Sequence, residues 1–315
     1  MIPAIAHFIW LTPDFPWLNV LAVRSAALRG GFERVVVHVT HEPSHELDGV
    51  PGVEVRRLDP AALLRDPSLL ARYHELSSPA ARSNLLRAAI LEREGGVYLD
   101  MDTVTIRDLS SLRAGRRFFC GLEHVAFPAP QPGQSAAALR SRGMALTAMR
   151  EGMRHAPGGW RYFRKVEHLF PRAANNAVLG ATPGHPFLNE LLERMARMPR
   201  QSALRRYALG THLLQRALAQ YDADDLAVFG PSVFYPLGPR ISRHWFARCR
   251  HPDLQGVVSG DTRVVHWYAS LHTEFERINP QFLRENADTQ LFARLVREFQ
   301  LLEATKKTSP SSVMP

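Results

Sequence analysis

The first hundred residues alternate between short apolar runs rich in β-branched residues and longer stretches with helical periodicity. Short apolar runs predict buried strands, and apolar residues repeated every three to four positions predict helices that pack on them. Alternation of the two predicts a parallel, Rossmann-like α/β sheet of the kind that binds a nucleotide. The expected strands are residues 5–11, 34–39 and 53–58, and the expected helix is 17–28, ended by Gly30-Gly31.

A second helix is predicted over residues 80–94. Ser78 offers an N-cap, Pro79 suits the first helical position, and Gly95-Gly96 ends the helix. Residues three and four apart lie on the same face of a helix, so a polar face is expected beside the buried apolar one. This polar face consists of Ser83, Asn84 and Arg87.

The strand after this helix ends on two carboxylates, in the segment Gly95-Gly96-Val97-Tyr98-Leu99-Asp100-Met101-Asp102. Side chains alternate between faces in an extended chain, so Tyr98, Asp100 and Asp102 point to one side and the apolar residues between them point into the core. Two carboxylates on one face suit a hard cation, Mg²⁺ or Mn²⁺, that holds a phosphate. Because α/β sheets bind ligands at the carboxyl ends of their strands, the segment predicts a metal site there.

Later segments predict a continuation of the fold with added helices. Strands are expected at 103–106, 117–122 and 262–267, helices at 186–198, 211–221 and 288–305, and arginine-rich helical stretches across 135–172. Residues 128–134 are rich in proline and glycine, as in a mobile flap, and residues 306–315 are typical of a disordered tail.

Four segments resemble the sugar-binding glycosyltransferases that contain a DXD motif, a family that includes yeast α-mannosyltransferases, animal α-1,4-galactosyltransferases and, more distantly, the clostridial glucosylating toxins. The clearest match joins Ser83-Asn84-Leu85-Leu86-Arg87 to the segment 95–102. Residues 2–10, 175–187 and 265–270 resemble the family's opening strand, its mid-chain Asn-containing strand and helix, and its C-terminal His/Ser segment, in that order. The resemblance implies one GT-A-type catalytic domain over residues 1–305, with a nucleotide-binding half at about 1–125 and an acceptor half at about 126–305.

The resemblance also implies roles for individual residues. Asp102 would bind the metal ion directly, while Asp100 would contact it through water or hold sugar hydroxyls. Arg87 would contact the donor sugar or a phosphate oxygen, and would form the catalytic set with the two aspartates. His266 and Ser270 would complete the metal shell from the C-terminal segment. The residues expected to bind the donor are Trp10, which would stack on the nucleobase, and Ser83, Asn84, Arg87, Tyr98, Asp100 and Asn176.

The activity implied by the resemblance is metal-dependent transfer of a hexose from a UDP- or GDP-sugar to an acceptor hydroxyl, with retention of anomeric configuration. Mn²⁺ or Mg²⁺ is the expected cofactor. The acceptor stays open: a cell-surface polysaccharide or other glycan, a lipid-linked oligosaccharide, a small molecule or a protein all fit. The donor sugar stays open too, because the family commonly has Asp where this chain has Asn84.

Composition is ordinary for a soluble globular protein, since 45% of the 315 residues are hydrophobic and 22% are charged. The two cysteines, Cys120 and Cys249, indicate no disulfide framework and suit a reducing compartment. No basic region followed by a long apolar run opens the sequence, so neither a signal peptide nor a membrane anchor is expected. With the heavy use of alanine and arginine, these features favour a bacterial, cytoplasmic enzyme.

The net charge of +9 is attributed to abundant arginine scattered over solvated faces. Basic surface also attracts sugar nucleotides and anionic lipid, so peripheral contact with the inner face of a membrane stays open. The sequence has no basic helix or aromatic-interleaved motif of a known kind, so no nucleic-acid partner is expected. It carries no signature of an oligomeric state.

Two alternative functions use the same residues. The run Asp100-Met101-Asp102-Thr103 also fits the nucleophile loop of haloacid-dehalogenase-type phosphatases, in which the first Asp attacks phosphorus and the second acts as acid and base. That loop normally follows the first strand, and no clear acidic metal pair occurs downstream beyond Asp224-Asp225. The second alternative is a relative that binds a sugar nucleotide without catalysis, for which Asn84 is the one indication.

Overall fold

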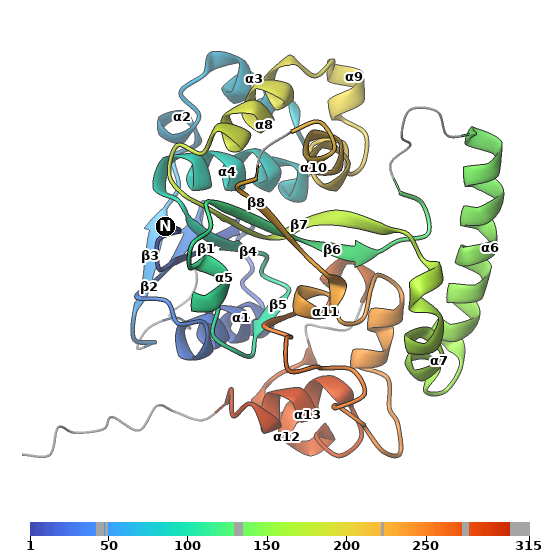
Figure 1. The fold of residues 1–315 in the computed structure, drawn as a ribbon. Coiled ribbons are helices and arrows are strands. Elements are labelled where there is room, and N and C mark those ends of the chain that lie inside the picture. The colour runs from blue at the N-terminus through green and yellow to red at the C-terminus, as the bar shows by residue number, and fades with distance from the viewer. Residues whose placement is uncertain (42–46, 48–49, 129–134, 222–223, 273–276, 303–315) are drawn as a thin grey trace, which may run out of the picture.

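A mixed seven-stranded sheet forms the centre of the protein, in the order β3-β2-β1-β4-β7-β6-β8 (Figure 1). The structure, a computed structural model, describes residues 1–41, 47, 50–128, 135–221, 224–272 and 277–302. Strands β1 to β4 pair in parallel, whereas β7 is antiparallel to both of its neighbours, β4 and β6. The strands are β1 (Ile5–Trp10), β2 (Arg34–Val39), β3 (Val53–Arg57), β4 (Gly96–Leu99), β6 (Phe118–His124), β7 (Arg172–Ala181) and β8 (Leu226–Phe229).

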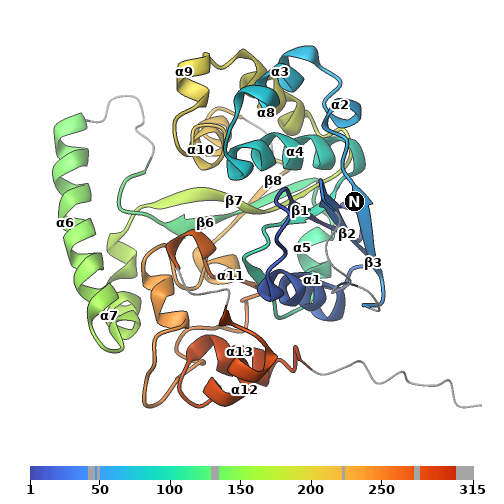
Figure 2. The same cartoon turned by 180° about the vertical axis from the view of Figure 1, so that it is seen from behind.

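Helices cover both faces of this sheet, as Figures 1 and 2 show. One face carries α2 (Pro60–Leu63), α3 (Pro67–Glu75), α4 (Pro79–Glu94), α8 (Pro186–Arg197), α9 (Arg200–Ala203) and α10 (Thr211–Leu218). The other face carries α1 (Trp17–Arg29), α5 (Ser110–Arg113) and α11 (Pro231–Phe234), and beyond them α12 (Pro280–Asn286) and α13 (Leu291–Glu298). Helices α6 (Ala136–His155) and α7 (Gly159–Val166) lie beside one end of β6 and β7.

Strand β4 separates two hydrophobic cores. Tyr98 packs with α4 and α8, whereas Val97, Leu99 and the following Met101 pack with α1 on the opposite face. This is the alternation that the sequence predicts. Gly95 connects helix α4 to strand β4. Its φ of +65° lies in the left-handed region, which glycine adopts readily. The helix and the strand therefore run antiparallel, and the N-terminal half of α4 lies beside the carboxyl end of β4.

A second, two-stranded sheet brings the C-terminal part of the chain to this end of β4. Strand β5 (Thr103–Thr105) pairs antiparallel with β9 (Val264–His266), and Thr103 is opposite His266. The short 3-10 turns are η2 (Glu167–Leu169), η3 (Ile241–Trp245) and η4 (Ala269–Leu271), the last of which directly follows β9.

Each predicted strand is present, as β1, β2, β3, β4, β5, β6, β7 and β9, with shifts in its bounds. The single helix predicted at 288–305 is wrong in extent. Helix α13 covers Leu291–Glu298, because Gln290 is extended before it and Gln300 has a φ of +52° after it. Helix α12 was not predicted, although Asn279 caps it by accepting a 2.9 Å hydrogen bond from the N–H of Phe282.

Two other expectations fall largely outside the described residues. The flap at 128–134 is described only at Pro128, and the tail at 306–315 is not described. Among the described helices, none has the length and apolar character needed to cross a membrane.

Candidate functional site

Asp102, three residues beyond β4, binds the C-terminal segment of the chain. Its Oδ1 lies 3.0 Å from Nε2 of His266, and its Oδ2 accepts a 2.8 Å hydrogen bond from the backbone N–H of Ala269. The N–H of Trp267 donates to the Asp102 carbonyl at 3.0 Å. The pairing of β5 with β9 causes these contacts, because it sets His266 opposite the residue next to Asp102.

Asp100, from the same segment, binds residues of α4 and β4. Its Oδ1 accepts a 2.6 Å hydrogen bond from the hydroxyl of Tyr98 and lies 3.0 Å from Nη2 of Arg87. The Arg87 guanidinium lies over the ring of Tyr98, 4.3 Å from its centre. The side chain of Asp100 is 26% exposed, so its carboxylate is fixed on one side and open to solvent on the other.

Arg87 is 5% exposed. Its guanidinium donates hydrogen bonds to both backbone and side-chain oxygens. Nε donates to the Ser83 carbonyl at 3.2 Å, Nη2 to the Ser83 hydroxyl at 2.9 Å, and Nη1 to the Asn176 carbonyl at 2.5 Å. A buried guanidinium held by so many acceptors is a rigid support. Arg87 therefore orients Asp100, and its contact with a donor molecule stays a prediction.

Asn84 and Asn176 meet between α4 and β7. The Nδ2 of Asn176 donates to the Oδ1 of Asn84 at 2.7 Å. A small cavity of about 20 Å³ adjoins the pair and is also lined by Arg87 and Gly210. A Cβ at Gly210 would come within 3.1 to 3.2 Å of both amides, so glycine allows α10 to start this close. Two residues predicted to bind the donor are thus brought together.

Burial and neighbouring charges move the pKa values of the two aspartates in opposite directions. Burial raises the pKa of Asp100, since it outweighs the opposing charge of Arg87. Burial also disfavours the charged form of Asp102, but the charge and hydrogen bond of His266 hold the pKa of Asp102 below its ordinary value. Burial alone would lower the pKa of His266. The charge and hydrogen bond of Asp102 outweigh this effect, so the pKa of His266 is raised. Asp102 and His266 therefore each favour the charged form of the other.

Asp100, Asp102 and His266 form a group that can hold a metal ion. Each offers one ligand atom, and these atoms lie within 4.8 Å of one another. Carboxylate oxygen together with imidazole nitrogen suits Mn²⁺ and related divalent cations. The Nδ1 of His266 is buried and has no hydrogen-bond partner among the described residues. Because buried polar atoms are normally paired, this nitrogen and the open side of Asp100 fit a bound cation.

Two other predicted site residues, Ser270 and Trp10, are not members of this group. Ser270 is exposed, and within the described part of the chain its side chain makes no hydrogen bond to Asp100 or Asp102. Trp10 is half-buried at the end of β1, where its Nε1 donates to the Asp14 carbonyl at 2.5 Å. The metal role of Ser270 and the nucleobase role of Trp10 stay predictions.

Sequence reasoning missed Glu123 and Tyr268, which lie behind the metal group. The Tyr268 hydroxyl donates to Oε2 of Glu123 at 2.7 Å, and its ring centre lies 4.0 Å from that of His266. Both residues are buried. A lone carboxylate in the apolar strand Phe118–His124 was the available signal, because buried acidic side chains are rare unless hydrogen-bonded.

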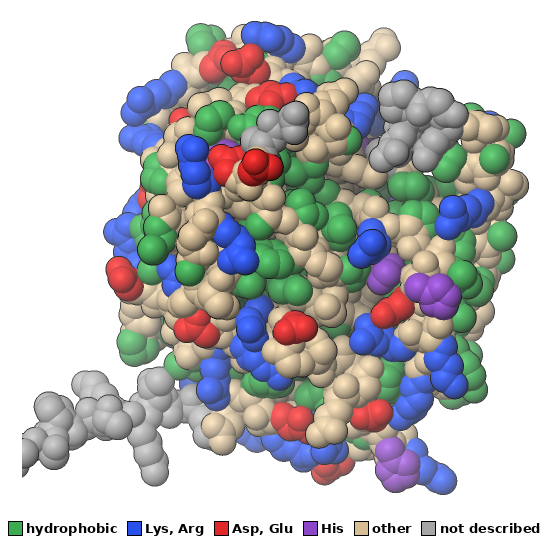
Figure 3. Space-filling view, in the orientation of Figure 1, with side chains coloured by type: hydrophobic (Ala, Val, Ile, Leu, Met, Phe, Trp, Pro, Cys, Tyr) green, Lys and Arg blue, Asp and Glu red, His purple; other side chains and the backbone are tan. Residues whose placement is uncertain are grey.

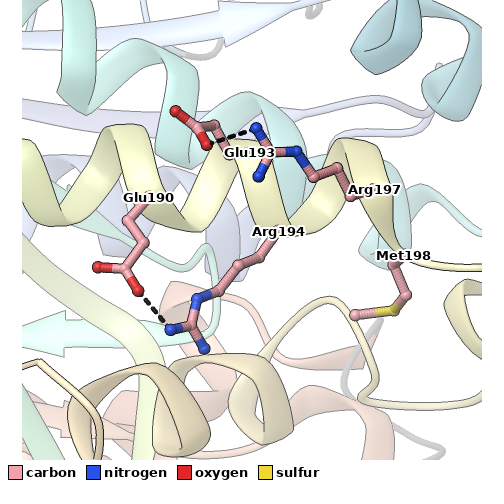
Figure 4. Close-up of a pocket in the computed structure, with 5 residues that line it drawn as sticks. All are labelled: Glu190, Glu193, Arg194, Arg197 and Met198. Carbon is pink, nitrogen blue, oxygen red and sulfur yellow. Dashed lines mark hydrogen bonds and ion pairs between the residues drawn. The ribbon is translucent and has the colours of Figure 1, made fainter.

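A larger open pocket of about 440 Å³ lies on the outer side of α8 (Figure 4). Two ion pairs at helical spacing line it, Glu190 with Arg194 and Glu193 with Arg197, together with Met198. These charges neutralise one another along the helix. None of the predicted site residues lines this pocket, and we assign no function to it.

Comparison with solved structures finds several glycosyltransferases. The chain resembles the PaToxG glycosyltransferase at 17% identity over 70% of this chain and 69% of that one, with a TM-score of 0.42. It resembles mouse xyloside xylosyltransferase 1 in its apo form at 14% identity over 85% and 98%, with a TM-score of 0.47. For the galactosyltransferase LgtC, in complex with donor and acceptor sugar analogs, the identity is 13% over 89% and 99%, with a TM-score of 0.44.

The sequence itself matches one protein family. A search of curated proteins found no match. Residues 32–119 match the family described as the glycosyltransferase sugar-binding region containing a DXD motif. The matched residues include the polar face of α4, strand β4 and both aspartates that follow it. Residues 32–119 are therefore similar to the sugar-binding region of the DXD glycosyltransferases.

Proposed function

We propose that this protein is a metal-dependent, retaining glycosyltransferase that moves a hexose from a UDP- or GDP-sugar to an acceptor hydroxyl. The observation that carries the proposal is the convergence of Asp100, Asp102 and His266 at the carboxyl end of β4, inside and beside the matched sugar-binding region. Mn²⁺ or Mg²⁺ fits the donor set. The nucleotide-binding half is assigned to about residues 1–125 and the acceptor half to about 126–305.

The protein would act mainly by electrostatics and positioning. A divalent cation held by the two aspartates and His266 would supply positive charge where the nucleoside diphosphate departs. Arg87 fixes one oxygen of Asp100 through a 3.0 Å contact, so that carboxylate keeps its direction. Asn84 and Asn176, beside the small cavity, offer amide groups to the hydroxyls of the donor sugar.

Retention would follow if the acceptor hydroxyl approaches on the side from which the diphosphate leaves. Such a front-face displacement needs no carboxylate nucleophile. Positioning of the acceptor would then supply much of the rate enhancement. The acceptor class is left open among a cell-surface polysaccharide, a lipid-linked oligosaccharide, a small molecule and a protein.

We also propose a cytoplasmic location. Cys120 and Cys249 are both free thiols, as a reducing compartment favours. Fractionation of cells that express the chain, with Cys120 and Cys249 probed for modification by a thiol reagent, tests this location; oxidised thiols in an extracytoplasmic fraction would contradict it.

A panel of UDP- and GDP-sugars tests the activity. The purified protein is incubated with each donor and Mn²⁺ in the absence of an acceptor, and the released nucleotide is measured by mass spectrometry. Many transferases hydrolyse their donor slowly under these conditions, so one donor is expected to release its nucleotide. Inversion of the anomeric configuration in a later transfer product would contradict the retaining mechanism while leaving the enzyme class intact.

The same experiment separates the two alternatives. A phosphatase of the haloacid-dehalogenase type would hydrolyse an artificial aryl phosphate and leave the sugar nucleotides intact. The family match covers Asp100 and Asp102 as part of a sugar-binding region, so we expect no turnover of the aryl phosphate. A non-catalytic relative would bind one donor, as calorimetry would show, without releasing its nucleotide.

A further inference from the structure

We propose that Glu123 is a positioning residue for the metal centre, acting through Tyr268 on the turn that binds Asp102. The inference rests on the proposed metal-dependent function and assigns a role to a buried carboxylate that the transfer reaction itself does not use. Neither residue belongs to the group of candidate metal ligands formed by Asp100, Asp102 and His266.

The Glu123 carboxylate is held in one direction by a neutral donor, the hydroxyl of Tyr268. It lies near the end of β6 and accepts a 2.7 Å hydrogen bond from the Tyr268 hydroxyl. Glu123 is 7% exposed, and a carboxylate so buried is stable only when its oxygens are paired. The central sheet thus provides a fixed acceptor for Tyr268.

The backbone of Tyr268 needs such a constraint. Its φ of +60° and ψ of +67° are left-handed, a conformation that costs free energy for a residue with a side chain. Strained backbone of this kind persists where its surroundings over-determine it. For Tyr268 these are the hydrogen bond to Glu123 and the contact of its ring with that of His266, with 4.0 Å between the ring centres.

The left-handed residue sits between the two amides that hold Asp102. The N–H of Trp267 donates to the Asp102 carbonyl at 3.0 Å, and the N–H of Ala269 donates to its Oδ2 at 2.8 Å. A change in the backbone of Tyr268 would turn one of these amides away from the other. Glu123 therefore fixes, through Tyr268, both the carboxylate of Asp102 and the adjacent, tilted ring of His266.

Mn²⁺ binding to the whole chain, without donor or acceptor, tests this inference. Tyr268→Phe keeps the ring and removes the hydroxyl, while Glu123→Ala removes the acceptor. Residues that orient metal ligands from behind typically contribute 10- to 100-fold in affinity, so each variant is expected to bind Mn²⁺ roughly tenfold more weakly or worse. Glu123→Gln retains an acceptor oxygen for Tyr268 and is expected to stay within about threefold of the wild type.

Two further measurements separate positioning from a general loss of stability. Hydrogen exchange at the Ala269 amide is expected to speed up in Tyr268→Phe, because its bond to Asp102 is no longer held. The control is Tyr73→Phe, a buried tyrosine of α3 on the opposite side of the sheet, which should change neither Mn²⁺ affinity nor this exchange rate. The double variant Glu123→Ala/Tyr268→Phe should lose no more Mn²⁺ affinity than either single variant, because both substitutions remove the same Tyr268–Glu123 hydrogen bond.

The outcomes are distinct. If the wild type binds Mn²⁺ and Tyr268→Phe binds it equally well with an equally protected Ala269 amide, the inference is overturned and the proposed function stands. Additive losses in the double variant would also overturn it, because they would mean that the two residues act separately. A wild type that binds no Mn²⁺ would overturn both the inference and the metal-dependent function.

Discussion

The Nε2 of His266 lies 3.0 Å from the Oδ1 of Asp102, although 164 residues separate the two in the sequence. The contact depends on the pairing of two strands of three residues each, β5 and β9. It joins the DXD segment to the C-terminal part of the chain. The candidate metal site therefore requires both the segment around Asp102 and the segment around β9 to be folded.

His266→Ala is expected to weaken Mn²⁺ binding by at least about 100-fold, since loss of a ligand should cost no less than loss of a residue that merely orients one. Isothermal titration calorimetry measures this directly. The matched control is His251→Ala, at an exposed histidine, which should leave the affinity unchanged. Equal affinity in the two variants would remove His266 from the metal group.

Arg87→Ala is expected to destabilise the fold by about 2–3 kcal/mol. Breaking a fully buried ion pair costs about 3–5 kcal/mol, and the partial exposure of Asp100 lets water solvate the carboxylate that is left. Urea unfolding at pH 7 measures the loss. Arg297→Ala breaks an exposed pair with Asp288 and should leave the free energy of unfolding nearly unchanged, so similar losses in the two variants would contradict the structural role of Arg87.

The buried pair His7 and His38 predicts how stability depends on pH. Burial lowers the pKa of His7 to about 4 and that of His38 to about 3, so both stay neutral in the folded protein. The Nε2–H of His7 donates to the Gly95 carbonyl, which leaves its Nδ1 to accept from His38 at 3.0 Å. The unfolded chain takes up protons below about pH 6.5, so the free energy of unfolding should fall as pH drops from about 6.5 toward 4.

Urea unfolding at several pH values checks this dependence. In His38→Gln the amide still donates to His7, one titrating group is removed, and the fall in stability between pH 6.5 and 4 should be smaller. A wild-type stability that is flat or rises on acidification would contradict the neutral pair.

The direction of the hydrogen bond between Asn84 and Asn176 predicts unequal tolerance to charge. Asn84→Asp keeps an acceptor for the Nδ2 of Asn176 and should change stability by less than about 1 kcal/mol. Asn176→Asp places two acceptors face to face and should cost about 1–3 kcal/mol. Thermal unfolding compares the two variants, and equal losses would show that the amides do not pair in this direction. Asn84→Asp also restores the residue common in the family, so we expect it to alter donor preference.

Local features of the sequence predict the unit of α4 and β4 well. Three features depend only on neighbours within a few residues. They are the turn at Gly95, the polar face with Ser83 and Arg87, and the alternation that places Tyr98 and Val97 on opposite faces of the sheet. Such patterns need no knowledge of the rest of the fold. The direct contact of Arg87 with Asp100 then follows from the antiparallel path of helix and strand.

The contacts that complete the site are non-local and have weak local signals. Strands β5 and β9 are too short for a period-two pattern to be distinctive, so only the family resemblance suggested His266. The edge strand β8, at Leu226–Phe229, is only partly buried and shows no alternation. Gly210 approaches the two asparagines because α10 packs on β7, which no nearby residue indicates.

The most direct test of the account is metal-dependent release of nucleotide from the preferred sugar donor, measured with Mn²⁺ and with EDTA. The wild type should release nucleotide only with Mn²⁺, and Asp102→Asn should release none above background, because Asp102 is placed at the metal. Asp288→Asn, at an exposed carboxylate, should match the wild type. Release that persists in EDTA or in Asp102→Asn would contradict a catalytic metal centre at this site.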